Sequence, residues 1–406
     1  MGEAATGQGS NSATIRQYNE RVILTALRRM GEASKAELAR RVNLTQNAAG
    51  QIVKELQQQR LVRTAGKRTG ARGQPATLMT LDPGGAYAIG VEIGRRSSDS
   101  ILLDFSGRVL LSRHAERSLP MPDAVVRAVR DDVAALRAAI PAPSRHRLVG
   151  IGVAVPYNLG SWRRELDIPD DVCAAWNGFD LLPALRTALD VPVMGENDGT
   201  AVAVAELFGG LGRELDDFAV VFIGAAVGGG LVLNGAYRRG VTGNAGDIGL
   251  MTVPPSRLPT APRPARPHPG ENSDILLNRA SVAALLRHLR LPRSATEAEL
   301  DAAVSAKPRL AAEWLEDCAD ALVGPVLSIG SLLDLQAVVV DGNLPRPMAA
   351  RLVERLRAGL AEHAPEARPP PRLLLGTAGR HAPATGAAML PLHVDYGADR
   401  DRLFGT

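Results

Sequence analysis

Apolar positions in the first eighty residues recur in segments with mostly helical spacing. The pattern between residues 14 and 30 predicts a helix, and Gly31 closes it. Ser34 is followed by Glu37 at the third helical position, as in a capping box, which predicts a short helix over residues 35–41. The amino-terminal part of the chain is therefore predicted to begin with two helices.

A third helix is predicted after the turn at residues 42–44. Thr45 is a good N-cap for this helix, which should run to about Arg60. Its inward face is expected to consist of Ala48, Ile52, Val53 and Leu56. Two short strands are then expected around residues 62–65 and 77–81, joined by a glycine-rich basic loop.

Two short helices around a tight turn, followed by two strands, form a winged helix-turn-helix domain. The start of its second helix enters the major groove of DNA. The candidates for DNA contact on that helix are Thr45, Gln46, Asn47 and Gln51, because amide side chains can pair with adenine edges. The loop between the strands supplies candidates for phosphate or minor-groove contacts: Lys67, Arg68 and Arg72. Gly50 would leave room for close approach to the duplex.

Strands alternate with helices after residue 81. Buried-strand patterns recur, and helices are predicted at residues 124–140 and 347–360. Two glycine-rich turns, at residues 90–94 and 224–230, follow strands and could approach a phosphate, but any α/β protein has such turns. This pattern predicts an α/β body with two lobes.

The charge distribution separates the two parts of the chain. Residues 1–80 contain 13 Lys/Arg and 5 Asp/Glu, a balance of +8, whereas residues 81–406 contain 34 and 38, a balance of −4. A basic head on an acidic body suggests that only the head binds a polyanion, here double-stranded DNA. The alternatives are a generic basic tail and a small trihelical interaction domain with a solvated charged loop.

Composition restricts the compartment and the class of protein. Hydrophobic residues make up 45%, enough for sizeable cores, and no stretch approaches about 18 unbroken apolar residues, so no membrane span is expected. The two cysteines, Cys173 and Cys318, form no CxxC pair, which excludes a thiolate metal cluster and fits a reducing cytoplasm.

Three long stretches of the body carry a resemblance to a known family. They read RGQPATLMTLDPGGAYAIGVEIG, WNGFDLLPALRTALDVPVMGENDGTAVAVAELFGG and FIGAAVGGGLVLNGAYRRGVTGNAGDIGLMTV. From about residue 12 to residue 392 the chain resembles the ROK family, in which repressors and sugar kinases share one body. The resemblance implies a two-lobed, actin-like and hexokinase-like (duplicated ribonuclease H-like) body with a sugar cleft between the lobes.

The resemblance also implies ligand-binding residues. Family kinases use an Asn-Asp pair on sugar hydroxyls, with the Asp as general base, and Asn197 and Asp198 match that pair. The same pair could equally open the following helix as its N-cap. Asp247 matches a carboxylate of the family's sugar loop, and Asn177 and Gly178 match a stretch that lines the other side of the sugar.

Three departures affect the matching nucleotide contacts. The family's Asp-x-Gly-Gly-Thr motif reads Glu92-Ile93-Gly94-Arg95-Arg96, and its Gly-Thr-Gly loop reads Gly224-Ala225-Ala226. A late Gly-Gly is replaced by Asp341-Gly342, which we expect to place a negative charge near a nucleotide. Phosphoryl transfer depends on positioning and charge neutralisation, so these changes predict that neither ATP binding nor kinase activity is kept.

The family's zinc site is also expected to be missing. Leu250 replaces its histidine, and the cysteine cluster is replaced by a Pro/Arg-rich run at residues 254–270 without cysteine. His268 alone cannot form a tetrahedral site, and Glu271 aligns too loosely to replace a sugar contact. No metal and no cofactor are therefore predicted, and the ligand could be a pentose, a sugar derivative or a polyol.

The sequence thus predicts a disordered tail at residues 1–11, a winged helix-turn-helix domain at 12–81 and a ligand-sensing body at 82–406. We expect a cytoplasmic transcriptional regulator of carbohydrate-related genes, acting as a repressor and forming a homodimer or homotetramer that binds operator DNA and a sugar-type effector. An active sugar kinase with an autoregulatory DNA-binding head is the alternative, and a constitutive DNA-binding protein with a dimerising body is a third possibility.

Overall fold

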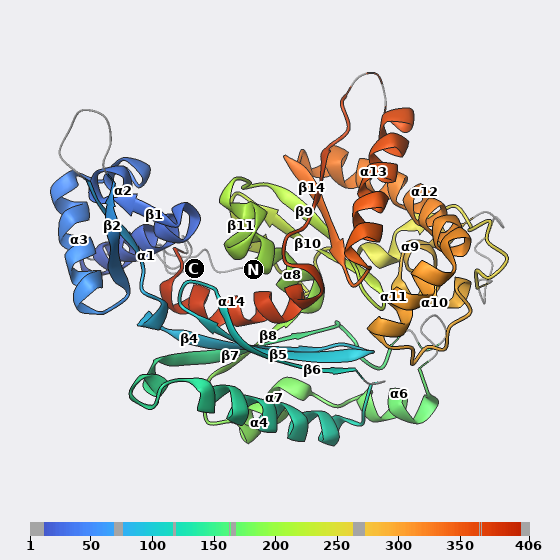
Figure 1. Ribbon diagram of the computed structural model, residues 1–406, viewed down its shortest axis with the longest axis horizontal. Helices are drawn as coiled ribbons and strands as arrows, with labels where there is room; N and C mark the ends of the chain where they lie inside the picture. Colours follow the sequence, from blue (N-terminus) through green and yellow to red (C-terminus); the bar gives the residue numbers. More distant parts are fainter. Residues whose placement is uncertain are drawn as a thin grey trace, which may run out of the picture.

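The computed structural model describes a winged head, residues 12–81, attached to a two-lobed body (Figure 1). The described residues are 12–68, 76–116, 119–161, 163, 168–262, 273–364, 366 and 368–398. No helix within these ranges is both long enough and apolar enough to cross a membrane. The predicted tail at residues 1–11 lies outside them.

The head contains three helices and a three-stranded sheet of order β1-β3-β2. Its elements are α1 (Ser12–Met30), β1 (Glu32–Ser34), α2 (Lys35–Arg41), α3 (Gln46–Gln58), β2 (Val62–Arg68) and β3 (Ala76–Leu81). Both predicted caps are present: Ser34 and Glu37 form a capping box, and the Thr45 hydroxyl accepts from the Ala48 amide at 3.2 Å. The sequence did not predict β1, because three residues carry too little periodicity. It also predicted strands that are too short at the loop between them, since it ended the first at residue 65 and began the second at residue 77.

The buried face of α3 differs by one residue from the prediction. Ala49 is fully buried together with Ile52, Val53 and Leu56, whereas Ala48 is exposed. The prediction was wrong at this position because two adjacent alanines fit the apolar pattern equally well, and only the packing against α1 and α2 separates them.

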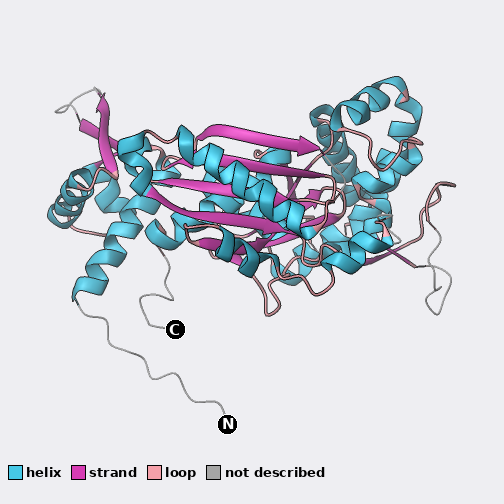
Figure 2. Ribbon diagram, turned by 90° about the horizontal axis from the view of Figure 1, so that it is seen from below, coloured by secondary structure: helices cyan, strands magenta, loops and turns pink. Residues whose placement is uncertain are grey.

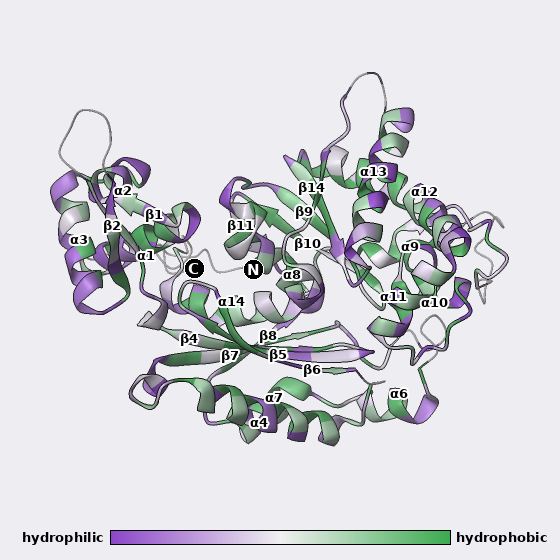
Figure 3. Ribbon diagram, in the orientation of Figure 1, coloured by the Kyte–Doolittle hydropathy of each residue, from purple (hydrophilic) through white to green (hydrophobic). Residues whose placement is uncertain are grey.

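The first lobe is a five-stranded sheet of order β6-β5-β4-β7-β8. The strands are β4 (Tyr87–Ile93), β5 (Ser97–Asp104), β6 (Val109–Glu116), β7 (Leu148–Val155) and β8 (Val193–Asn197). The helical elements of this lobe are η1 (Pro83–Gly85), α4 (Pro122–Ala139), η2 (Ala142–Arg147), α6 (Asp170–Trp176) and α7 (Leu181–Ala188). Helices α4 and α7 cover the outer face of the sheet (Figure 2), and the strands they cover are hydrophobic at the centre (Figure 3).

The second lobe repeats this plan with the strand order β11-β10-β9-β14-β15. Its strands are β9 (Phe218–Ile223), β10 (Val227–Leu233), β11 (Ala236–Arg238), β14 (Ala337–Gly342) and β15 (Arg372–Leu375), with a separate pair β12 (Thr252–Val253) and β13 (Asp274–Ile275). Its helical elements are η3 (Leu211–Arg213), η4 (Ile248–Leu250), α9 (Leu276–Arg279), α10 (Val282–His288), α11 (Glu297–Ala306), α12 (Pro308–Leu333), α13 (Arg346–His363) and η5 (Gly379–His381). The two sheets confirm the predicted two-lobed α/β body.

Helices α8 (Asp198–Gly209) and α14 (Ala382–Tyr396) lie between the two sheets, and glycines let them pack there at backbone contact. A Cβ atom on Gly152 of β7 would lie 1.8 Å from the Ala387 carbonyl oxygen, and one on Gly386 would lie 1.7 Å from the Ala201 carbonyl oxygen. No side chain larger than that of glycine fits at either position, so these two glycines determine how closely α14 packs against β7 and α8 between the lobes.

The head and the body share one hydrophobic core. Ile23 and Leu27 of α1 are buried in the same cluster as Phe105, Met389 and Leu392 of the body. The Arg28 guanidinium is buried against the Phe105 ring at 5.3 Å and donates from Nη2 to the Phe105 carbonyl at 2.9 Å. The head is therefore packed onto α14 through α1 instead of being joined only by the chain at residue 82.

A second contact joins the body to α3 of the head. Arg147 of η2 lies directly before β7 and donates from Nη1 to the Gly85 carbonyl at 2.8 Å and to the Gln59 carbonyl at 3.4 Å. Gln59 is the C-cap of α3. The first lobe thus touches the end of α3 as well as α1.

Candidate ligand cleft and DNA-binding surface

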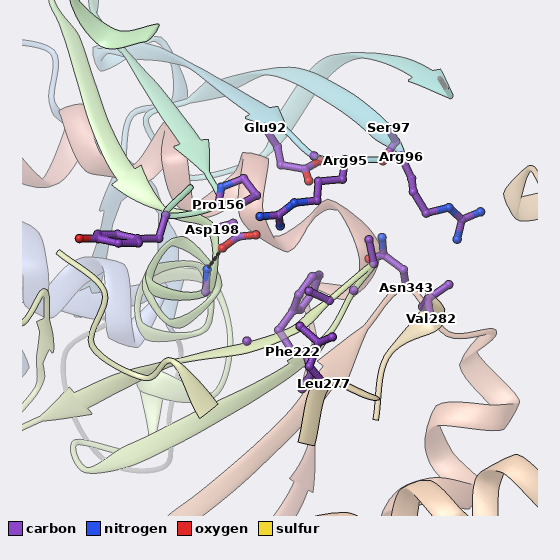
Figure 4. A pocket seen from close by; sticks show the side chains of 18 of the residues that line it. Glu92, Arg95, Arg96, Ser97, Pro156, Asp198, Phe222, Leu277, Val282 and Asn343 are labelled. Carbon is purple, nitrogen blue, oxygen red and sulfur yellow. Dashed lines mark hydrogen bonds between the residues drawn. The ribbon is translucent and has the colours of Figure 1, made fainter. Parts of the chain in front are cut away.

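A cavity of about 560 Å³ lies between the lobes (Figure 4). Its walls come from the carboxyl ends of β4, β7 and β8, the start of α8, the turn after β9, and the loops before η4 and α11. The ends of strands from both sheets meet here, which is where α/β proteins commonly bind small ligands. Two predicted ligand residues from β8 and α8, Asn197 and Asp198, and the predicted Asp247 all line this cavity.

Asn197 is the N-cap of α8, one of the two roles that the sequence left open, and it also lines the cavity. Its Oδ1 accepts from the Gly199 and Thr200 amides at 2.9 and 3.3 Å, which makes it the N-cap of α8. Its Nδ2 points the other way and donates to Oδ1 of Asn244 at 3.0 Å. The cap holds the side chain in one orientation while the amide nitrogen stays at the cavity wall.

Asn244 extends this chain of hydrogen bonds to Asp247. Its Nδ2 donates to Oδ2 of Asp247 at 2.8 Å, and all three residues line the cavity. Burial raises the pKa of Asp247, and the bond from Asn244 partly offsets that effect. Sequence analysis missed Asn244, although its position three residues before a predicted ligand residue in the same loop was a usable signal.

Asp198 is the first residue of α8 and faces the cavity (Figure 4). Burial raises the pKa of its carboxyl above the usual value, while the nearby charge of Arg95 and the Gly199 amide act in the opposite direction. The Gly199 amide donates to Oδ1 at 2.9 Å. A buried carboxylate of this kind can accept hydrogen bonds from ligand hydroxyls.

Arg95 projects into the cavity toward Asp198 (Figure 4). It is only 6% exposed, and Nη2 donates to the Asn158 carbonyl at 2.6 Å and to Oγ of Ser161 at 3.5 Å. Burial lowers the pKa of Arg95 to about 10, although the charge of Asp198 favours the protonated form. Arg95 thus fills part of the cleft with a guanidinium group.

Glu92, the first residue of the same segment, lies beside Asp99 on the neighbouring strand. Burial and the negative charge of Asp99 raise the pKa of Glu92 well above its usual value. Burial would also raise the pKa of Asp99, but hydrogen bonds from His381 and His114 outweigh it and leave that pKa lowered. Glu92 is therefore the carboxyl that keeps its proton more readily.

Several contacts join the lobes beside the cavity. His381 of η5 bonds to Asp99 of β5 at 3.0 Å, and the Glu297 amide of α11 donates to Glu116 of β6 at 3.0 Å. Arg96 also donates to the Ala295 carbonyl. His114, Glu116 and Glu297 place nitrogen and oxygen atoms within 4.8 Å of one another, but Arg380 already pairs with Glu297. These groups thus form contacts between the two lobes at the edge of the cavity.

Asn177 and Gly178 lie away from this cavity. Both are exposed, and the Asn177 amide closes α6 by donating to the Cys173 carbonyl at 3.0 Å. Their neighbours Trp176 and Phe179 line a second cavity of about 310 Å³, which Asn197 also borders. The structure thus places the two predicted residues beside a separate hollow next to the main one.

The other two segments for which the sequence predicted lost nucleotide contacts differ in their relation to the cavity. Ala225 lines it, as does the exposed Leu250, which the sequence comparison matched to a family histidine. Asp341 is not among the lining residues. Its carboxylate accepts from the Gly379 amide at 2.7 Å and from Arg346 at 3.0 Å, so the negative charge is paired inside the second lobe. His268 and Glu271 lie outside the described residues.

The predicted DNA-reading residues share an exposed face at the start of α3. Gln46 and Asn47 are exposed, and Thr45 uses its hydroxyl for the cap. Gln51 is also exposed, but its Nε2 donates to Oε1 of Glu55 at 2.9 Å. Gln46 and Asn47 are thus free of side-chain bonds to the described residues, whereas Gln51 would have to exchange its partner to reach a base.

The wing carries its basic residues on exposed backbone. Lys67 and Arg68 are exposed at the end of β2, and Arg68 pairs with Oε1 of Glu37 at 2.8 Å. The amide and hydroxyl of Ser34, together with the charge of Arg68, lower the pKa of Glu37 to about 2. Arg72, the third predicted wing contact, lies outside the described residues.

Comparisons with known proteins agree with this architecture. The family model described as "ROK family" matches residues 88–393. The chain is 30% identical over 374 residues to the uncharacterized protein y4fQ of Sinorhizobium fredii, covering 92% of this chain and 90% of that protein. It is 23% identical to the xylose repressor of Bacillus subtilis over 59% of this chain and 61% of the repressor, so the match spans about three fifths of that relative.

Solved structures show the same fold. A ROK family transcriptional regulator, homologous to the MLC protein of Escherichia coli, superposes with a TM-score of 0.67 at 18% identity, covering 97% of this chain and 100% of that one. A ROK family glucokinase from Streptomyces griseus, solved with glucose and AMPPNP, superposes with a TM-score of 0.56 at 21% identity, covering 75% of this chain and 99% of that one. The first neighbour covers the head as well as the body, which confirms the predicted fold class.

Proposed function

This chain belongs to the ROK family, and from that premise we propose that it is a DNA-binding transcriptional repressor of carbohydrate-related genes, controlled by a sugar-type ligand. One observation supports the proposal most strongly. A winged head with exposed amides on α3 shares its core with a body that contains a ligand cleft. The surface proposed to contact DNA and the cleft proposed to bind the ligand therefore belong to parts that share one core.

On the DNA side, the head combines shape and charge. The start of α3 presents Gln46 and Asn47, which can read base edges, and Lys67 and Arg68 extend from the wing toward phosphates. A dimer would place two such helices in successive major grooves about 34 Å apart, so the operator is expected to be palindromic.

On the ligand side, the hydrogen bonds that link Asn197, Asn244 and Asp247 hold their amide and carboxylate groups in fixed orientations at the cavity wall. Such a row can bond to neighbouring hydroxyls of a sugar or polyol. Ligand binding would alter the lobe contacts at Glu297 and His381, and the first lobe would pass that change to α1 and to Gln59. The ligand shifts the heads only as far as it prefers one lobe arrangement.

The proposal includes no phosphoryl transfer, ATP or zinc. Arg95 occupies cleft space with a guanidinium, Ala225 offers no hydroxyl, and Leu250 offers no metal ligand. An active kinase is the second candidate, because Asp198 still faces the cavity where a base would be needed. ATP consumption over a sugar panel, abolished by Asp198→Asn, would support that candidate instead.

Footprinting of the purified chain on the DNA upstream of its own gene tests the proposal. We expect a protected palindrome, weakened about tenfold or more by Gln46→Ala because one base contact is lost. Gln58→Ala is the matched control, since Gln58 is exposed at the opposite end of the same helix. A sugar or polyol should then change the protection. Absence of any protected site would refute the proposal.

A further inference from the structure

Arg95 is buried without a carboxylate partner. Among the described residues, no Asp or Glu oxygen lies within 4.0 Å of its guanidinium, and Nη2 bonds only to a carbonyl and a hydroxyl. Nε is buried without a hydrogen-bond partner. Buried Arg279, in contrast, pairs with Asp317 and Asp320 at 2.8 Å each. A desolvated cation with only neutral acceptors is costly unless something else supplies the anion.

Because Arg95 lines the cavity, a molecule bound there could supply that anion. The side chain lines the cavity and points at Asp198, yet the two charges make no direct ion pair (Figure 4). Its Nη1 has no hydrogen-bond partner among the described residues, and unlike Nε it is not among their fully buried unpaired atoms. One edge of the guanidinium is therefore available to a molecule in the cavity.

We propose that the ligand of this cleft is a polyhydroxylated carboxylic acid, such as a uronic or aldonic acid, whose carboxylate binds Arg95 and whose hydroxyls bind Asn244 and Asp247. This inference deepens the proposed function and rests on it. A carboxylate and a guanidinium form short, charge-assisted hydrogen bonds. The remaining wall, with amide and carboxylate acceptors, suits the hydroxyl groups.

The charges of the cavity favour one negative charge over two. Asp198 and Asp247 line the same cavity as Arg95, so a dianionic phosphate bound at Arg95 would also meet these two carboxylates. The other lining arginines, Arg96 and Arg293, share the cavity with Glu92, Glu116 and Glu297, so the lining as a whole has no excess of positive charge to balance a second negative charge. The phosphate-loop position at Ala225 also lacks a hydroxyl donor. A sugar phosphate shares the oxyanion chemistry and is therefore a separate arm of the test.

The test is isothermal titration calorimetry on the full chain with matched pairs of probes. The pairs are glucose and glucuronate, galactose and galacturonate, and glucitol and gluconate, with glucose 6-phosphate as the phosphate arm. We expect at least one acid to bind at least about tenfold more tightly than its neutral partner, since one charge-assisted bond is gained. Binding of the neutral partners alone, of the phosphate alone, or of none of the probes would overturn the inference.

Variants at Arg95 tie the preference to this side chain. Arg95→Gln should weaken binding of the acid about tenfold or more and leave the neutral partner unchanged, while Arg95→Lys, which keeps the charge, should lose less. Arg309→Gln is the matched control, because Arg309 is 91% exposed and is not among the residues that line the cavity. If Arg95→Gln does not fold, Arg95→Lys against wild type still decides, and equal affinity for acid and neutral probes in both overturns the inference.

Operator binding, measured on the same samples, separates the two proposals. Acid binding that depends on Arg95 in a chain that binds no DNA would refute the repressor and keep the inference. Release of the operator by a neutral sugar, with no preference for acids, would keep the repressor and refute the inference.

Discussion

Gly50 offers a substitution that should separate stability from DNA binding. It is the fifth residue of α3, in the turn of helix that follows Gln46 and Asn47. Its backbone is not in the left-handed region, and an added Cβ would have no described atom within 4 Å apart from the backbone of its own helix. Nothing in the protein alone therefore requires glycine at this position.

The expected gain in stability follows from helix propensity. Glycine inside a helix is about 0.8–1 kcal/mol less favourable than alanine, so Gly50→Ala should stabilise the free head by about 1 kcal/mol. Because head and body share a core, we take the 406-residue chain as the unfolding unit, for which that gain corresponds to a rise in Tm of roughly 1 °C. If the duplex approaches the helix here, the new methyl group disturbs a base contact, which costs about 1–3 kcal/mol and thus about tenfold or more in operator affinity.

Differential scanning calorimetry and fluorescence anisotropy on a labelled operator measure the two effects. Gly209→Ala is the control, because Gly209 is an exposed helical residue of the body whose added Cβ also has no atom within 4 Å. It should raise or keep Tm without a change in operator affinity. Unchanged operator affinity in Gly50→Ala would show that α3 does not approach DNA at this turn, and a lower Tm would contradict the structural assignment itself.

Three further predictions concern charge and packing. Glu37→Gln should reduce the loss of stability at low pH. Because the pKa of Glu37 is lowered to about 2 in the folded state, its ionised carboxylate stabilises the fold fully above pH 4.5, the usual pKa, and this stabilisation disappears as pH falls toward 2. Urea unfolding at several pH values measures the difference. Glu92→Gln should act with the opposite sign. Because the pKa of Glu92 is raised in the folded state, the wild type loses stability as pH rises above 4.5, and the variant, which cannot ionise there, does not. The free energy of unfolding of the variant minus that of wild type should therefore be larger at pH 7 than at pH 4. Gly152→Ala should destabilise the body by about 1–3 kcal/mol or more in the same assay, since its Cβ would lie 1.8 Å from the Ala387 carbonyl oxygen, and an unchanged unfolding midpoint would refute the close packing of α14.

The helices of the head were predicted well because their capping residues lie close to one another in the sequence. The capping box at Ser34 and the N-cap at Thr45 each depend on residues three positions apart, and both occur as expected. Errors arose where contacts between distant segments decide. The pairing of Glu32 with Thr80 creates a strand that its own three residues do not signal, and packing alone selects Ala49 over Ala48.

The cleft was predictable in its residue types but not in its hydrogen bonds. Motif positions identified Asn197, Asp198 and Asp247, and all three line one cavity. The bridging role of Asn244 depends on how loops from the two lobes meet, and the direction of the Arg95 side chain depends on its contacts with the segment after β7, more than sixty residues away in the sequence. A pattern along the chain contains no information about that meeting.

The core shared by α1 and α14 bears on whether such heads can be exchanged between relatives. Residue 81 ends the head in the sequence, but Arg28 is buried against Phe105, and Leu27 lies in one cluster with Met389 of α14. A head transplanted onto another body at residue 81 would expose these apolar side chains and leave a buried guanidinium without its ring. A functional hybrid would have to carry the matching surface of α14 and Phe105 with it, so the two parts are expected to be inherited as a pair.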